Sequence, residues 1–323
     1  MTKPIIYITR KIPVELLKPY EDRYDFRMWP ESETPVPREI LRREAREADG
    51  VLCMLTEKID EAFLSENAHL QIIANMAVGY DNINVEAANR KGIWVTNTPD
   101  VLTETTADLT FALLMATARR VTEASDYIKE DRWKNWSPFL LAGSDIHHKT
   151  IGIVGMGRIG KAVAKRATGF NMSILYHNRT RKHQAEKEVG VTYVPFETLL
   201  DESDYVISLV PLTKETKHLF NEAAFQKMKE SAIFINVSRG GTMDEIALYE
   251  ALQSGEIKAA GLDVFEEEPI SSDHPLLKLD NTVCLPHIGS SSMKTRSQMI
   301  TLCLDNIDAV LQGQQPKTPV RIE

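Results

Sequence analysis

Residues 155–160, with the sequence GMGRIG, form the clearest chemical pattern in the chain. They follow the apolar run Ile151–Val154 and precede a helix-compatible stretch that begins at Lys161. In this setting the first glycine permits a tight turn, the second admits a pyrophosphate close to the backbone, and the third lets helix and strand pack closely. The pattern therefore predicts a dinucleotide site at the amino end of a helix. The alternative is a tight turn that binds no ligand.

The end of the next expected strand indicates which dinucleotide is bound. A site for NAD usually carries Asp or Glu about 20 residues beyond the glycines, where it accepts a hydrogen bond from the ribose 2′-hydroxyl. Here the strand is followed by His177-Asn178-Arg179-Thr180-Arg181-Lys182, which contains three cations and no carboxylate. Arg179 and Arg181 are suited to charge-assisted hydrogen bonds with a 2′-phosphate. The sequence thus favours NADPH, with NADH still possible, and the alternative is a solvated basic turn.

Three polar residues, Arg239, Glu268 and His287, follow three later strands. In open α/β sheets, ligands bind beyond the carboxyl ends of the strands, so these residues are expected on the ligand side of one sheet. Each alone has an ordinary structural interpretation, and their combination beside a dinucleotide site is what indicates function. The strands expected to precede them are Ala232–Val237, Ala259–Val264 and Thr282–Leu285.

Together these residue types fit the reduction of a 2-oxo acid by hydride transfer. The reaction needs a cation for the substrate carboxylate and an acid for the developing alkoxide. The guanidinium of Arg239 suits the first task and also polarises the carbonyl. The imidazole of His287 suits the second, and Glu268 would favour its imidazolium form and fix its orientation.

The elements that must position these residues are short β-branched runs alternating with longer amphipathic stretches, which is typical of parallel sheets flanked by helices. A single long helix is expected over Thr103–Lys129 and a last one over Met293–Leu311. The segment Asp131–His148 is rich in Trp and Leu, so we expect it to pack against something, with another subunit as one option. The remaining expected strands are Ile5–Thr9, Tyr24–Met28, Val51–Leu55, Ile72–Asn75, Trp94–Thr96, Thr150–Val154, Ser173–His177, Thr192–Val194 and Tyr205–Leu209, and the early helices are Pro37–Ala48 and Ile59–Asn67.

Composition sets the broad class. The 323 residues are 43% hydrophobic and 26% charged, which suggests a soluble protein of about two domains. The net charge of −8 gives no support to a nucleic-acid or anionic-membrane partner. Cys53, Cys284 and Cys303 are far apart, so neither a disulfide framework nor a metal site is indicated. Without a signal-like or membrane-spanning run, the expected location is cytoplasmic.

The chain resembles the D-isomer-specific 2-hydroxyacid dehydrogenase family, and most closely its glyoxylate/hydroxypyruvate reductase and 2-ketogluconate reductase branch. The resemblance covers essentially the whole chain, in order. The motifs that carry it are VGYDNIN (78–84), VLTETTAD (101–108), GIVGMGRIG (152–160), NVSRGG (236–241), GLDVFEEEP (261–269) and LPHIGSSS (285–292).

The resemblance implies an α/β fold of two doubly wound parallel-sheet domains, with a Rossmann cofactor domain inserted into a flavodoxin-like substrate domain. Residues 1–100 plus 290–323 would form the substrate domain and 101–289 the cofactor domain, with the active site in the cleft between them. Arg239, Glu268 and His287 match the family's catalytic residues. The family's NAD-binding acid falls at His177, as in members that prefer NADPH.

The resemblance also implies the binding residues and a homodimer formed through the cofactor domain. Trp136 looks like the part of its loop that reaches the neighbouring subunit's substrate pocket, and an ordinary dimer contact is the alternative. The substrate would be bound by Met54, the amides of Val78 and Gly79, and Arg239. The cofactor contacts would be Thr106, Gly155, Gly157, Arg158, Ile159, Gly160, Asn178, Arg179, Thr180, Pro211, Val237 and Asp263.

Two other functions remain open from the sequence. A formate dehydrogenase shares the Arg/His pair but lacks a supporting acid, and Glu268 argues against it. A nucleotide-sensing corepressor could use the same fold through a surface that the sequence does not reveal. Among substrates, the sequence does not choose between glyoxylate, hydroxypyruvate and 2-ketogluconate, because Met54 and Leu55 are merely flexible or apolar.

Overall fold

The computed structural model describes residues 2–320 and divides into two compact units. The discontinuous unit runs up to Leu102 and resumes at Ser292, and the continuous unit is Thr103–Ser291. Within the described residues, no helix is both long and apolar enough to span a membrane.

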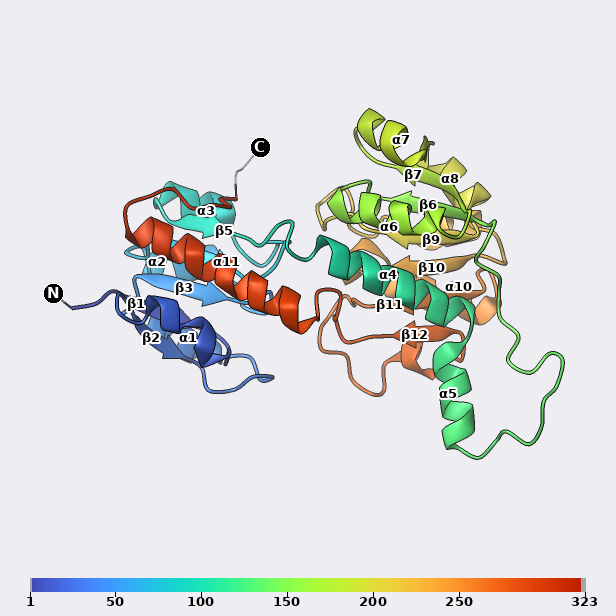
Figure 1. The fold of residues 1–323 in the computed structure, drawn as a ribbon, viewed down its shortest axis with the longest axis horizontal. Coiled ribbons are helices and arrows are strands. Elements are labelled where there is room, and N and C mark those ends of the chain that lie inside the picture. The colour runs from blue at the N-terminus through green and yellow to red at the C-terminus, as the bar shows by residue number, and fades with distance from the viewer. Residues whose placement is uncertain (1, 321–323) are drawn as a thin grey trace. The chain divides into compact units, whose positions relative to one another are not determined.

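The discontinuous unit is built on five parallel strands in the order β2-β1-β3-β4-β5. Its central strands have the sequences IIYI, GVLC and IIAN and are almost wholly buried, as expected for a parallel sheet covered on both faces. The last helix, α11, packs against β3, β4 and β5 (Figure 1). The elements are β1 (Ile5–Ile8), β2 (Asp25–Met28), α1 (Arg38–Ala45), β3 (Gly50–Cys53), α2 (Glu61–Glu66), β4 (Ile72–Asn75), α3 (Val85–Arg90), β5 (Trp94–Thr96) and α11 (Met293–Leu311).

The continuous unit holds seven parallel strands in the order β12-β11-β10-β9-β6-β7-β8. Helix α4 packs beside α6 and against β10 and β11 (Figure 1). The strands are β6 (Thr150–Val154), β7 (Ser173–His177), β8 (Thr192–Tyr193), β9 (Tyr205–Ser208), β10 (Ile233–Asn236), β11 (Ala259–Leu262) and β12 (Thr282–Cys284). The helices are α4 (Thr103–Ala118), α5 (Val121–Lys129), α6 (Arg158–Thr168), α7 (His183–Val189), α8 (Phe196–Glu202), α9 (Glu222–Lys227) and α10 (Glu245–Ser254).

The two strand orders confirm the predicted fold class. The order of the first sheet is that of a flavodoxin-like domain, and the seven-stranded sheet contains the order of a Rossmann domain with one further strand. The expected strands lie where the sequence placed them, with ends that differ by one or two residues.

The prediction of one helix over 103–129 is wrong, because α4 ends at Ala118 and α5 begins at Val121. Arg120 adopts a left-handed conformation with φ 52°, which breaks the helix. The returning chain explains the break, since the amide of Ser144 donates to the Ala118 carbonyl at 2.8 Å. A Cβ on Gly143 would lie 2.3 Å from that same oxygen, so only glycine allows this approach.

The segment Asp131–His148 packs against its own unit only near its end, where Ile146 is buried and the Asp145 carbonyl accepts from Tyr205 Oη at 2.7 Å. Trp133, Trp136 and Phe139 are 56%, 75% and 85% exposed. In Figure 1 the part of this loop that follows α5 stands away from the helices and strands of its unit. Its contact with another subunit therefore stays a prediction.

Replacing Gly261 by alanine should destabilise the continuous unit. A Cβ at this position in β11 would lie 2.6 Å from Thr117 Oγ1 and 2.9 Å from Leu113 Cγ, both on α4. Overpacking of this kind costs about 1–3 kcal/mol. Gly157→Ala is the control, because its Cβ would meet open space. Thermal unfolding should show a lower Tm for G261A alone, and equal Tm values would contradict the packing argument.

Candidate active site

The carboxyl ends of β10, β11 and β12 bring three of the predicted site residues together. These strands are neighbours in the seven-stranded sheet, and they are followed in turn by Arg239, Glu268 and His287. His287 Nδ1 lies 2.7 Å from Glu268 Oε2, which makes a hydrogen-bonded ion pair when the imidazole is protonated. The side chains of His287 and Glu268 are 24% and 27% exposed, so solvent or a ligand can reach them.

The loop that carries Arg239 is held against the loop that carries Glu268. The Arg239 carbonyl accepts hydrogen bonds from Asn236 Nδ2 at 3.1 Å and from Thr242 Oγ1 at 2.7 Å. A Cβ on Gly240 would lie 1.8 Å from the carbonyl carbon of Phe265, so this contact requires glycine. The close approach of the two backbones places the guanidinium near enough to act electrostatically on Glu268.

His287 sits on a turn that Asp263 holds in place. The residue has a left-handed φ of 53°, which is unusual for a histidine. The two carboxylate oxygens of Asp263 accept from the amides of Ile288 at 2.8 Å and Gly289 at 2.7 Å. Burial raises the pKa of Asp263, although these two amides and the charge of His287 act in the opposite direction. Asp263, which the sequence predicted as a cofactor contact, thus positions the turn that carries the histidine.

Glu268 is held as a carboxylate by its neighbours. Its Oε1 accepts from the Phe265 amide at 3.0 Å. Burial by itself would raise the pKa of Glu268, but the hydrogen bond and charge of His287, the Phe265 amide and the charge of Arg239 outweigh it, so the pKa lies below its ordinary value. With Nδ1 bound to this carboxylate, Nε2 is the ring nitrogen left to donate a proton to another molecule.

The glycine-rich turn has the form that a dinucleotide site requires. Gly155 has φ +106°, and a Cβ there would lie 2.6 Å from the Leu209 carbonyl oxygen. A Cβ on Gly160 would lie 2.2 Å from the Gly155 oxygen, whereas one on Gly157 would meet nothing within 4 Å. The first and third glycines therefore allow close packing, and the second leaves open space at the amino end of α6. Arg158 and Ile159 are the first two residues of that helix.

The end of β7 only partly matches the predicted phosphate site. Asn178 Oδ1 accepts from the Met156 amide at 3.2 Å, and its Nδ2 donates to the Thr180 carbonyl at 2.9 Å, so it joins this segment to the glycine turn. Arg181 is bound instead by Glu186 on α7, at 2.7 and 3.1 Å. Arg179 is exposed. The sequence reasoning missed Glu186, whose pairing depends on the direction in which α7 leaves the turn.

Among the remaining predicted cofactor residues, Val237, Asp263 and Pro211 follow strands, and Thr106 lies in the first turn of α4. The Cβ position of Gly289 is within 3.5 Å of Thr106 Cγ2 and Val237 Cγ1 and 3.2 Å from Asp263 Oδ2, so these residues form one cluster. Pro211 follows β9, and its carbonyl accepts from Thr216 Oγ1 at 2.6 Å. No group of three or more His, Cys, Asp or Glu residues suited to a metal ion occurs within residues 2–320.

The predicted substrate residues Met54, Val78 and Gly79 follow β3 and β4 of the discontinuous unit, and Trp136 lies in the exposed loop of the continuous one. Asn97 Nδ2 donates to the Val78 carbonyl at 2.8 Å, and Asn75 Nδ2 to that of Gly79 at 2.9 Å. These side chains fix the turn whose amides are predicted to bind the substrate carboxylate.

The pairing of Glu268 predicts a pH-dependent stability. Because its folded-state pKa is lowered, ionised Glu268 stabilises the fold above its ordinary pKa, and this stabilisation is lost as pH falls through the folded-state pKa. Between about pH 6 and about pH 3, urea denaturation should show a larger loss of unfolding free energy for the wild type than for Glu268→Gln. Glu267→Gln, at the exposed neighbouring position, should behave as the wild type. Parallel pH curves for wild type and E268Q would contradict the pairing.

Comparison with known proteins identifies the family of the chain. The D-isomer specific 2-hydroxyacid dehydrogenase NAD-binding domain matches residues 111–289. A glyoxylate reductase from Pyrococcus horikoshii is 49% identical over 99% of this chain and 97% of its own, and one from Korarchaeum cryptofilum is 48% identical over the same shares.

Solved structures of relatives superpose on the chain over nearly its full length. A protein from Thermus thermophilus superposes with a TM-score of 0.92 at 41% identity, covering 98% of this chain and 100% of its own. An NADPH-dependent glyoxylate/hydroxypyruvate reductase from Sinorhizobium meliloti, in complex with NADP and malonate, has a TM-score of 0.84 at 34% identity, with 99% and 97% covered. The chain belongs to the D-isomer specific 2-hydroxyacid dehydrogenase family.

Proposed function

We propose that the protein reduces small 2-oxo acids to D-2-hydroxy acids with a reduced nicotinamide cofactor. The observation that carries this proposal is the hydrogen bond between His287 and Glu268, next to Arg239, on the same sheet as the glycine-rich turn. The relatives named as glyoxylate reductases, and the solved glyoxylate/hydroxypyruvate reductase, support it. The candidate substrates are glyoxylate, hydroxypyruvate and 2-ketogluconate.

Each side chain has a distinct task in this reaction. The bound cofactor supplies the hydride. Arg239 binds the substrate carboxylate and polarises the reacting carbonyl, with the amides of Val78 and Gly79 as further donors to the carboxylate. His287 Nε2 donates the proton that the developing alkoxide requires, while Glu268 holds the ring by Nδ1 and stabilises its positive charge.

The cofactor we propose is NADPH in preference to NADH. The second strand of the Rossmann order, β7, ends at His177 rather than at an acid, so no carboxylate there repels a 2′-phosphate or binds a 2′-hydroxyl. Arg179 supplies the positive charge. Arg181 contributes less than the sequence suggested, because Glu186 already binds its guanidinium. The solved relative with NADP supports the choice.

We also propose a homodimer in which the loop over residues 131–148 contacts the second copy. The support is its exposed aromatic side chains, which monomeric surfaces rarely present.

The cysteines Cys53, Cys284 and Cys303 are all free thiols, which favours a reducing compartment such as the cytoplasm.

His287→Ala should abolish the proposed acid. We expect kcat for 2-oxo acid reduction to fall about 100-fold or more, with little change in KM for the cofactor. His183→Ala, on exposed α7 of the same unit, is the control and should match the wild type. Steady-state NADPH oxidation with the three candidate substrates measures kcat and KM for each variant. A near-wild-type kcat in H287A would remove His287 from the acid role. A wild type that binds NADPH but reduces no 2-oxo acid would favour a nucleotide-sensing protein.

Arg179→Ala tests the cofactor preference. The wild type should show a higher kcat/KM with NADPH than with NADH, and Arg179→Ala should raise KM for NADPH about 10-fold and leave KM for NADH nearly unchanged. Arg181→Ala is the matched comparison, with a smaller effect expected because of Glu186. Equal or better efficiency of the wild type with NADH would refute the assignment of Arg179.

A further inference from the structure

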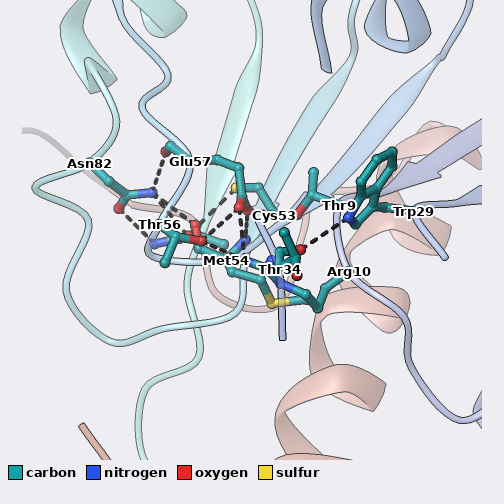
Figure 2. A network of polar contacts seen from close by, with 10 residues as sticks. Thr9, Arg10, Trp29, Thr34, Cys53, Met54, Thr56, Glu57 and Asn82 are labelled. Atoms are coloured by element: carbon teal, nitrogen blue, oxygen red, sulfur yellow. Dashed lines mark hydrogen bonds and ion pairs between the residues drawn. The ribbon is translucent and has the colours of Figure 1, made fainter. Parts of the chain in front are cut away.

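A buried carboxylate, Glu57, lies at the carboxyl edge of the five-stranded sheet and takes no part in the chemistry described above. The residue is only 4% exposed. Its Oε2 accepts from Thr9 Oγ1 and from the Met54 amide, each at 2.6 Å. Its Oε1 accepts from Thr56 Oγ1 at 2.6 Å and from Arg10 Nη2 at 3.2 Å. Figure 2 draws these contacts as dashed lines that meet at the Glu57 carboxylate.

The carboxylate therefore joins two strand ends that are neighbours in the sheet. Thr9 and Arg10 directly follow β1, and Met54 directly follows β3. Arg10, which is 9% exposed, supplies the compensating positive charge. A carboxylate that accepts two hydrogen bonds on each oxygen uses all its lone pairs, so each donor has one defined position.

Asn82 extends the network from the loop after β3 to the loop after β4. Its Nδ2 donates to the carbonyls of Met54 at 3.2 Å and Glu57 at 3.1 Å. Asn75 Nδ2 donates to Asn82 Oδ1 at 3.2 Å and to the Gly79 carbonyl at 2.9 Å. The loop with Met54 and the loop with Val78 and Gly79 are thus parts of one hydrogen-bonded unit.

The Glu57 network lies where open α/β sheets commonly bind ligands. In an open sheet of order β2-β1-β3-β4-β5, the chain changes direction between β1 and β3, and ligands bind beyond the carboxyl ends at this point. Here Glu57 occupies the junction of β1 and β3 and closes it with protein groups. A ligand at this edge must then be bound by the loops after β3 and β4. Glu57 fixes the positions of these loops.

We propose that Glu57 is a positioning residue for the 2-oxo acid: it holds the two loops that carry Met54, Val78 and Gly79 in the arrangement that binds the substrate carboxylate. This inference rests on the proposed function. Glu57 acts through those loops and does not itself touch the substrate. Its replacement should therefore weaken substrate binding more than cofactor binding, because the proposed cofactor residues lie in the other unit.

Glu57→Gln is a sharp test because the two side chains have nearly the same shape. The NH₂ group of glutamine is a donor, and either placement makes it face an N–H donor, from Met54 in one case and from Arg10 in the other. The amide therefore cannot satisfy the network, and either the Met54 loop or Arg10 must shift, which disturbs the junction of β1 and β3. Asp49→Asn is the matched control, because Asp49 precedes β3 at the opposite end of the sheet and accepts from the Ile5 amide at 2.8 Å.

We expect E57Q to raise KM for glyoxylate and hydroxypyruvate about 10-fold or more, with KM for NADPH changed less than twofold. D49N should leave both KM values near those of the wild type, even where its Tm falls. An unchanged KM for the 2-oxo acids in E57Q, or an equal rise in D49N, overturns the inference. If the wild type itself reduces no 2-oxo acid, the proposed function fails first, and the two failures are thereby distinguished.

A second pair of variants covers the case in which E57Q does not fold. Thr9→Val removes the hydroxyl that donates to Glu57 Oε2 and keeps the branched shape, whereas Thr9→Ser keeps the hydroxyl. The inference requires a higher KM for the 2-oxo acid in T9V and a nearly normal KM in T9S. Equal KM values in the two variants contradict it.

Discussion

The hydrogen bond between His287 Nδ1 and Glu268 Oε2 is the interaction on which the proposed chemistry depends. It directs one ring nitrogen toward protein and leaves the other for a substrate, and it keeps a compensating charge beside the imidazolium. Each partner is held by hydrogen bonds between carboxylates and backbone amides. The Asp263 carboxylate binds the amides that follow His287, and the Phe265 amide binds Glu268. The site is therefore a property of three adjoining strand ends rather than of any single loop.

Close backbone contacts explain why glycine recurs around this site. Gly240 lets the loop of Arg239 touch the backbone at Phe265, and Gly155 lets the glycine-rich turn touch Leu209. In both cases a Cβ would collide with main chain, which cannot move aside as a flexible side chain can. The conformations of these turns thus follow from packing between neighbouring strand ends, and a Cβ on Gly157 would meet nothing within 4 Å.

Much of the fold, and the grouping of Arg239, Glu268 and His287, was predictable from the sequence, because both follow local patterns. Buried parallel strands are short apolar runs, and a polar residue directly after one must lie at the ligand edge, as Arg239 and His287 do. The break at Arg120 was not predictable, because apolar spacing continues through it and the cause is a distant contact of Gly143 and Ser144 with Ala118. Glu57 was missed for a related reason. Its sequence neighbours suggest a surface turn, and only the pairing of β1 with β3 brings Thr9 and Arg10 to its carboxylate.

The central claim is that His287 donates the proton while Glu268 holds its ring and Arg239 binds the carboxylate. A crystal structure of the protein with NADP and oxamate, an unreactive mimic of a 2-oxo acid, tests it most directly. We expect His287 Nε2 within hydrogen-bonding distance of the oxygen that mimics the reacting carbonyl, with Nδ1 still on Glu268 and the Arg239 guanidinium on the carboxylate. A complex in which oxamate is bound without contact to His287, or with Glu268 turned away from Nδ1, would contradict it.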